Sequence, residues 1–110
     1  MYSYFVSIND QVKEEVQRQI DITSEEIPYE KRRWSKSTAK SRLRYKDISD
    51  FLLGYEYERI SEDGIWYYRS LVSKRRTGAS GEEAERVAKE INSIIFDRVP
   101  EIRQAILKTS

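Results

Sequence analysis

Large apolar side chains are scarce in this chain, and their scarcity limits what the chain can fold into. Leu, Ile, Val and Phe together number 26 of 110 residues, whereas 35% of the residues are charged. That apolar fraction lies just above the level expected of disordered chains. We therefore expect a single small domain, 1–110, with a thin core that a homodimer contact or another partner would help to complete.

The residue types present exclude most catalytic chemistry. The chain has no Cys and no His, so disulfides, thiolate zinc sites, cysteine nucleophiles and imidazole bases are impossible. Glu56 and Glu58 could hold a divalent cation together with Asp63, but solvated acidic positions are far commoner than metal sites. We predict no catalysis, no metal and no cofactor. The lack of a long apolar run or leader segment predicts a cytoplasmic protein with no membrane partner.

The first 30 residues indicate a strand followed by a helix. Residues 2–8 are mostly aromatic and β-branched, and Tyr4, Val6 and Ile8 would share one side of a strand, which is typical of a half-buried strand. Asn9 or Asp10 can cap a helix over residues 11–26, where apolar residues recur four apart. Pro28 is expected to end that helix.

The segment 29–44 is open to two interpretations. It is rich in Ser and Lys and poor in large apolar residues, so residues 31–44 could form a flexible basic arm. Alternatively, the same residues could form the polar start of a helix that becomes clear from Tyr45 and stops at Gly54.

The next segment predicts a β-hairpin. Residues 55–61 and 65–73 are rich in Tyr, Ile, Trp and Val, and they flank Glu62-Asp63-Gly64. A two-residue turn and a three-residue loop with Gly64 in a bulge give opposite registers, and we favour the three-residue loop. The aromatic residues of this hairpin are expected mainly in the core, with one outward face left for base stacking.

The last third of the chain carries the best helical pattern. Ser80 and Glu83 have the spacing of a capping box, and an amphipathic stripe follows them. Pro100 is expected to break or bend this helix. Near the bend, Phe96 and Val99 would leave an exposed edge for a homodimer.

The order of these elements predicts an α+β fold. A small antiparallel sheet, made of the N-terminal strand plus the hairpin 55–73, would be covered by helices. One missed strand within residues 29–44 would instead give a ferredoxin-like split βαβ arrangement.

Positive charge is concentrated in two segments although the net charge is only +1. Residues 31–46 contain eight Lys and Arg with no acidic residue, and residues 65–78 contain four more, again with no acidic residue. Such side chains neutralise phosphates, and aromatic residues among them can stack on bases. The predicted nucleic-acid-binding residues are Lys31, Arg32, Arg33, Trp34, Lys36, Lys40, Arg42, Arg44, Tyr45, Lys46, Arg69, Lys74, Arg75 and Arg76.

We therefore expect a non-catalytic protein that binds DNA or RNA. Two basic islands, 31–46 and 74–76, would contact phosphates from one face. The alternative is a small protein–protein interaction module, an inhibitor or adaptor of the kind that phages and plasmids encode, whose basic segment docks on an acidic partner. The plainest interpretation is a solvated arm or helix face whose positive charge offsets the negative charge of the first 30 residues.

Overall fold

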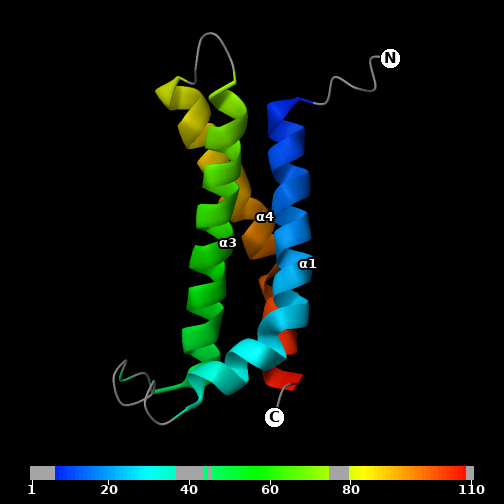
Figure 1. Ribbon diagram of the computed structural model, residues 1–110, viewed down its shortest axis with the longest axis vertical. Coiled ribbons are helices and arrows are strands. Elements are labelled where there is room, and N and C mark those ends of the chain that lie inside the picture. Colours follow the sequence, from blue (N-terminus) through cyan, green and yellow to red (C-terminus); the bar gives the residue numbers. More distant parts are fainter. Residues whose placement is uncertain (1–6, 37–43, 45, 75–79, 109–110) are drawn as a thin grey trace.

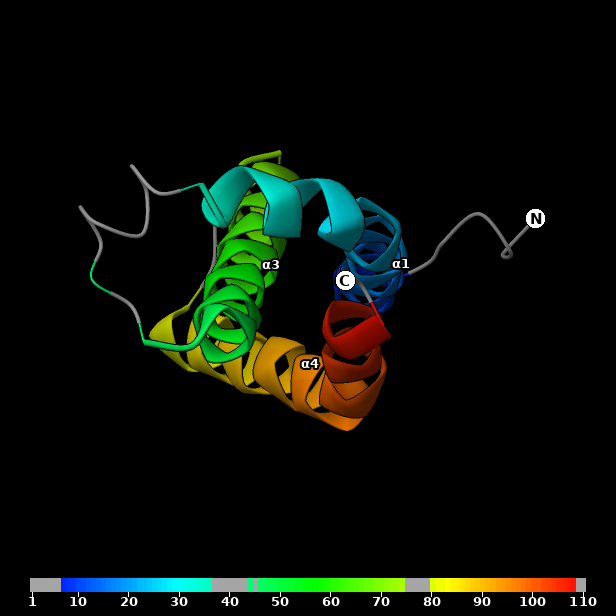
Figure 2. The ribbon, with the colours of Figure 1, turned by 90° about the horizontal axis from the view of Figure 1, so that it is seen from below.

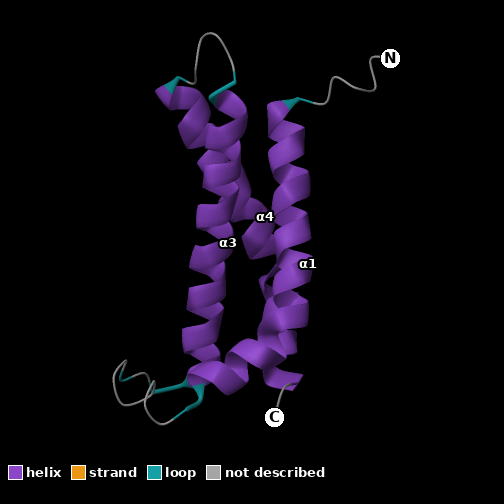
Figure 3. Ribbon diagram, viewed as in Figure 1, coloured by secondary structure: helices purple, strands orange, loops and turns teal. Residues whose placement is uncertain are grey.

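Long helices lie side by side along the longest axis of the computed structural model (Figure 1). Helix α1 spans Ile8–Trp34, α3 spans Ile48–Val72 and α4 spans Gly81–Lys108. The residues that the structure describes are 7–36, 44, 46–74 and 80–108. This part of the chain contains no strand (Figure 3), so the predicted α+β fold with its antiparallel sheet is wrong, and so is the ferredoxin-like alternative.

Helix α1 begins earlier and ends later than its sequence pattern predicts. Ser7 is the N-cap, and its hydroxyl accepts a hydrogen bond of 3.0 Å from the backbone N–H of Asp10, so the predicted caps one turn later are wrong. The predicted strand falls mostly outside the described residues. Pro28 lies inside the helix instead of ending it. The last turns of α1 run toward the start of α3 (Figures 1 and 2), as expected where proline removes one backbone hydrogen bond.

The predicted hairpin 55–73 is a continuous helix. Every fourth residue of α3 is buried, which is the spacing of a helix face that points into the core. This stripe is hard to recognise because two of its members are not apolar, and because tyrosines beside it imitate a strand. The buried residues are Leu52, Glu56, Ile60, Gly64, Tyr68 and Val72.

Gly64 marks a close approach of the three helices and not a turn. A methyl group added there would lie 3.0 Å from Cγ2 of Val16 on α1 and 3.3 Å from two methyl groups of Ile91 on α4. Both neighbours are themselves fully buried. The glycine therefore lets α1 and α4 pack directly on the backbone of α3. Gly54 is also inside α3, where the sequence predicted a helix end, and it faces open space.

Helix α4 is the element that the sequence predicts best. The backbone N–H of Glu83 donates to the Ser80 hydroxyl at 3.1 Å, which confirms the predicted start. Pro100 does not break the helix, which continues to Lys108. Its buried stripe packs against both other helices and consists of Val87, Ile91, Ile95, Ile102 and Ile106.

The two glycines of α3 give a matched pair of substitutions. We expect Gly54→Ala to raise the free energy of unfolding by about 0.5–1 kcal/mol, because alanine is the better helix former and the site is open. We expect Gly64→Ala to lower it, because overpacking a dense core costs about 1–3 kcal/mol and outweighs the same propensity gain. Urea unfolding of both variants measures the difference. Equal stabilisation by both would show that the three helices are not in close contact at Gly64.

Candidate nucleic-acid interface

One end of the bundle carries most of the predicted phosphate-binding residues that the structure describes. The last turn of α1 is basic, and two more cations precede α3, which starts at the same end (Figure 1). Helix α4 also ends here (Figure 1), where its last turn contacts Lys31 of α1. We name this region the basic end, defined by Lys31, Arg32, Arg33, Lys36, Arg44 and Lys46.

Lys31 has a structural role within the basic end. Its side chain is half-buried, and its ammonium donates a 3.0 Å hydrogen bond to the backbone carbonyl of Ile106 in the last turn of α4. A helix C-terminus carries partial negative charge and unsatisfied carbonyls, so a lysine there is favourable. Lys31 therefore fixes the end of α4 to α1, and the other five cations of the basic end are exposed.

A pocket opens on the surface of the basic end. Its lining consists of Lys31 and Arg32 from the last turn of α1 and Ser35 and Lys36 directly after it. The Ser35 hydroxyl donates to the carbonyl of Lys31, which closes the last turn of the helix. Positive side chains around a concave surface concentrate the electric field, so this pocket favours anionic oxygens.

Arg59 and Arg98, which reach from one helix to another, are neutralised by carboxylates, whereas most of the basic end is not. Arg98 of α4 lies 2.7 Å from Asp21 and 2.6 Å from Glu101. At the basic end, Arg33 lies 3.8 Å from Glu30. Within the described part of the chain, no ion pair forms with Arg32, Lys36, Arg44 or Lys46. Their charge therefore remains available to a ligand.

Trp34 is used in packing, although the sequence predicts it as a base-stacking residue. Its ring lies 5.5 Å from that of Phe51 and 5.6 Å from that of Tyr55, centroid to centroid. Its indole N–H donates to Glu30 at 3.0 Å, and the guanidinium of Arg33 lies 4.8 Å above the ring. The indole therefore packs the end of α1 against α3 and fixes the position of the last turn of α1, which carries the basic end.

A buried carboxylate lies next to this support, and the sequence patterns do not predict it. Glu56 is fully buried on α3, and its carboxylate is 3.0 Å from the guanidinium of Arg59. Arg59 also donates to the hydroxyl of Thr23 at 3.0 Å, and it lies 3.4 Å from Glu26. Desolvation raises the pKa of Glu56 to about 7. The Arg59 charge opposes this rise, and the carboxylates of Glu30 and Glu26 add to it.

The cation site that Glu56, Glu58 and Asp63 could have formed is not present in the structure. Glu56 is buried, whereas Glu58 and Asp63 are exposed on α3. Among the residues that the structure describes, no group of three or more acidic side chains could hold a metal ion. The spacing Leu52-Glu56-Ile60, four apart within an otherwise apolar stripe, is the signal that would have shown Glu56 to be a core residue.

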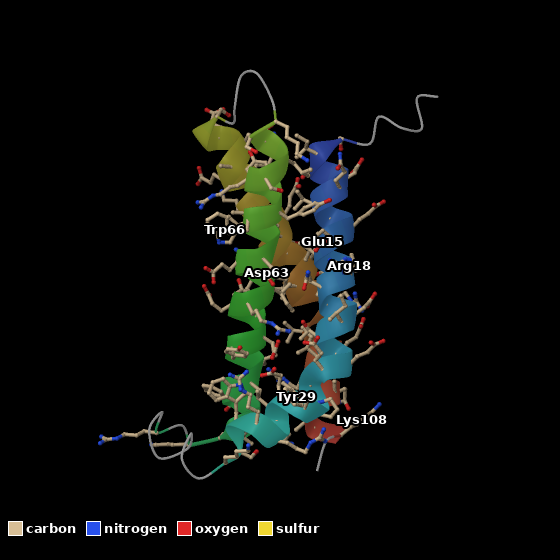
Figure 4. The ribbon with its side chains drawn as sticks, viewed as in Figure 1. Glu15, Arg18, Tyr29, Asp63, Trp66 and Lys108 are labelled. Atoms are coloured by element: carbon tan, nitrogen blue, oxygen red, sulfur yellow. The ribbon has the colours of Figure 1, made fainter. Side chains whose placement is uncertain are left out.

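The described residues of the second basic segment lie far from those of the first. Arg69 lies in the last turn of α3 and Lys74 just after it, at the opposite end of a 25-residue helix that is about 37 Å long at about 1.5 Å per residue. The guanidinium of Arg69 lies 5.5 Å over the ring of Trp66, which is on the side of α3 away from α1 (Figure 4). The described members of the two islands therefore do not form one surface. Outside the described residues are Lys40, Arg42, Tyr45, Arg75 and Arg76.

Comparisons with known proteins add no assignment. No protein-family model matches the chain. Neither the comparison with curated proteins nor the comparison with solved structures found a match. None of the helices in the described ranges combines the length and the apolar character needed to cross a membrane.

The buried carboxylate predicts how stability depends on pH. A folded-state pKa of about 7, against 4.5 for the unfolded group, means that the folded state binds more protons between these values. The free energy of unfolding therefore falls as pH rises from about 4.5 to 7, by roughly 3 kcal/mol at about 1.4 kcal/mol per pKa unit. Glu56→Gln should remove this fall and be more stable than the natural protein at about pH 8.

Urea unfolding at about pH 5 and pH 8 measures the effect. Glu58→Gln is the matched control, because Glu58 is exposed on the same helix. We expect the control to keep the pH dependence of the natural chain. An unchanged dependence in the Glu56 variant would mean that this carboxylate is already ionised in the folded protein at pH 5.

Proposed function

We propose that this protein binds nucleic acid at the basic end, through phosphate contacts and without catalysis. One observation carries the proposal. Arg32, Lys36, Arg44 and Lys46 are exposed at one end of the bundle, with no ion pair among the described residues, and Arg32 and Lys36 line a pocket there. Exposed Lys and Arg gathered in this way are typical of surfaces that contact the phosphate backbone. A cytoplasmic location, where nucleic acid is accessible, belongs to the same proposal.

The basic end carries more positive charge than is needed to neutralise the negative C-termini of the helices that end there. The C-termini of α1 and α4 together contribute a partial negative charge of about one elementary unit. Lys31 already donates to the end of α4. Five exposed cations remain, of which Arg33 pairs with Glu30. The other four exceed the two acidic residues at the start of α3, Asp47 and Asp50, and the helix charge, so the potential outside the basic end is positive.

The size of the basic end limits the contact to a short stretch of nucleic acid. Five exposed cations can neutralise at most about five phosphates, so log K should fall with log salt with a slope of up to about −4.5 on duplex DNA and −3.5 on single strands. The contacts go to phosphates and not to base edges, which predicts weak sequence preference. Arg69 and Lys74, at the other end of α3, are not part of this contact.

Charge reversal at the pocket tests the proposal. We expect the double variant Arg32→Glu/Lys36→Glu to lose most of its affinity for a fluorescent mixed-sequence oligonucleotide at low salt. We also expect its salt slope to be smaller by about 2, because two phosphate contacts are lost. Titrations with single-stranded and duplex DNA and RNA, each at two salt concentrations, measure both quantities.

The control carries the same change of charge at another place. Lys13→Glu/Arg86→Glu reverses two exposed cations, one in the N-terminal half of α1 and one in the N-terminal half of α4. It should keep the affinity and slope of the natural chain. Equal loss in both variants would indicate a net-charge effect, and no loss in the pocket variant would favour the adaptor that docks on an acidic protein. Either result contradicts the proposal.

A further inference from the structure

A second regular stripe runs along α4, about 100° around the helix from the stripe that builds the core. It lies on the side that borders α3, where Asn92 accepts a 3.2 Å hydrogen bond from the hydroxyl of Ser61. Its residues recur at alternating spacings of three and four, which is the pattern of a helix that packs against another helix. All of them are exposed or half-exposed. They are Glu85, Lys89, Asn92, Phe96, Val99 and Arg103.

The centre of this stripe is apolar. Phe96 is 60% exposed, and one face of its ring is stacked on Tyr57 of α3 at 5.2 Å between centroids. Val99, one helical turn further along, is half-buried. A large aromatic side chain that is fixed on one face and open on the other is typical of the central residue of an interface.

The ends of the stripe carry opposite charges. Glu85 lies near the start of α4 and Arg103 near its end, and both are exposed. Glu85 is 3.9 Å from Lys89, and both side chains are more than 70% exposed, so this pair is weak. Within the described residues, Arg103 forms no ion pair.

We infer that this face pairs with the same face of a second copy of the chain, with the two α4 helices antiparallel. If Asn92 lies opposite the partner's Phe96, the same register places Glu85 opposite the partner's Arg103 and Lys89 opposite the partner's Val99. The arrangement has twofold symmetry, so the ion pair between Glu85 and the partner's Arg103 forms twice. A parallel pairing would instead place Glu85 against Glu85 and Arg103 against Arg103.

A charge swap tests the register. We expect Glu85→Arg and Arg103→Glu, each alone, to raise the dimer dissociation constant by about tenfold or more, because each replaces two attractive pairs by two repulsive ones. The double variant Glu85→Arg/Arg103→Glu should restore the dimer, because both pairs re-form with reversed sign. Sedimentation equilibrium of the full chain over a range of concentrations, without nucleic acid, measures these constants.

Phe96→Ser and Trp66→Ser form the matched pair for the apolar centre. Both aromatic side chains are 60% exposed, but Trp66 lies on the outer side of α3. Phe96→Ser should weaken the dimer, and Trp66→Ser should leave it unchanged. A natural chain that stays monomeric, or a charge swap that does not restore the dimer, would overturn the inference whether or not the chain binds nucleic acid.

Discussion

Close packing of the three helices at Gly64 determines how this apolar-poor chain can fold. The absence of a side chain at that position brings Val16 of α1 and Ile91 of α4 onto the backbone of α3. Short distances between helices allow valine, isoleucine and leucine, with one tyrosine, to fill the core. A thin set of apolar residues is then sufficient, because each helix contributes one narrow stripe with little empty volume between them.

The sequence predicts an element where its core stripe is uniformly apolar. In α4 the stripe has Val87, Ile91 and Ile95, and a capping box precedes it, so both the helix and its start are evident. In α3 the stripe includes Glu56 and Gly64, and local patterns then favour a hairpin. Gly64 is explained by its contacts with Val16 of α1 and Ile91 of α4. Glu56 pairs with Arg59 of its own helix, which in turn contacts Thr23 of α1. No local pattern contains these contacts between helices.

The buried polar residues lie between the apolar core and the basic end. Glu56 and its partner Arg59 lie between the apolar layer around Gly64 and the layer where Glu30 holds Trp34. Glu30 therefore links the buried carboxylate electrostatically to the indole that supports the last turn of α1. The carboxylates of Glu56 and Glu30 thus connect the apolar core with the basic end. Of these two, Glu56 changes its protonation with pH near neutrality.

The prediction of a hairpin over 55–73, where the structure has a helix, also limits how much of the candidate site could be predicted. A hairpin over 55–73 returns the chain to its starting point, so it would place residues 74–76 near residue 46 and join the two basic islands. A helix moves the chain steadily away, so Arg69 and Lys74 lie at the far end of α3. Sequence reasoning could identify exposed cations such as Arg32 and Lys36, because their charge does not depend on the fold. It could not predict which cations share a surface, because that depends on the direction in which α3 carries the chain.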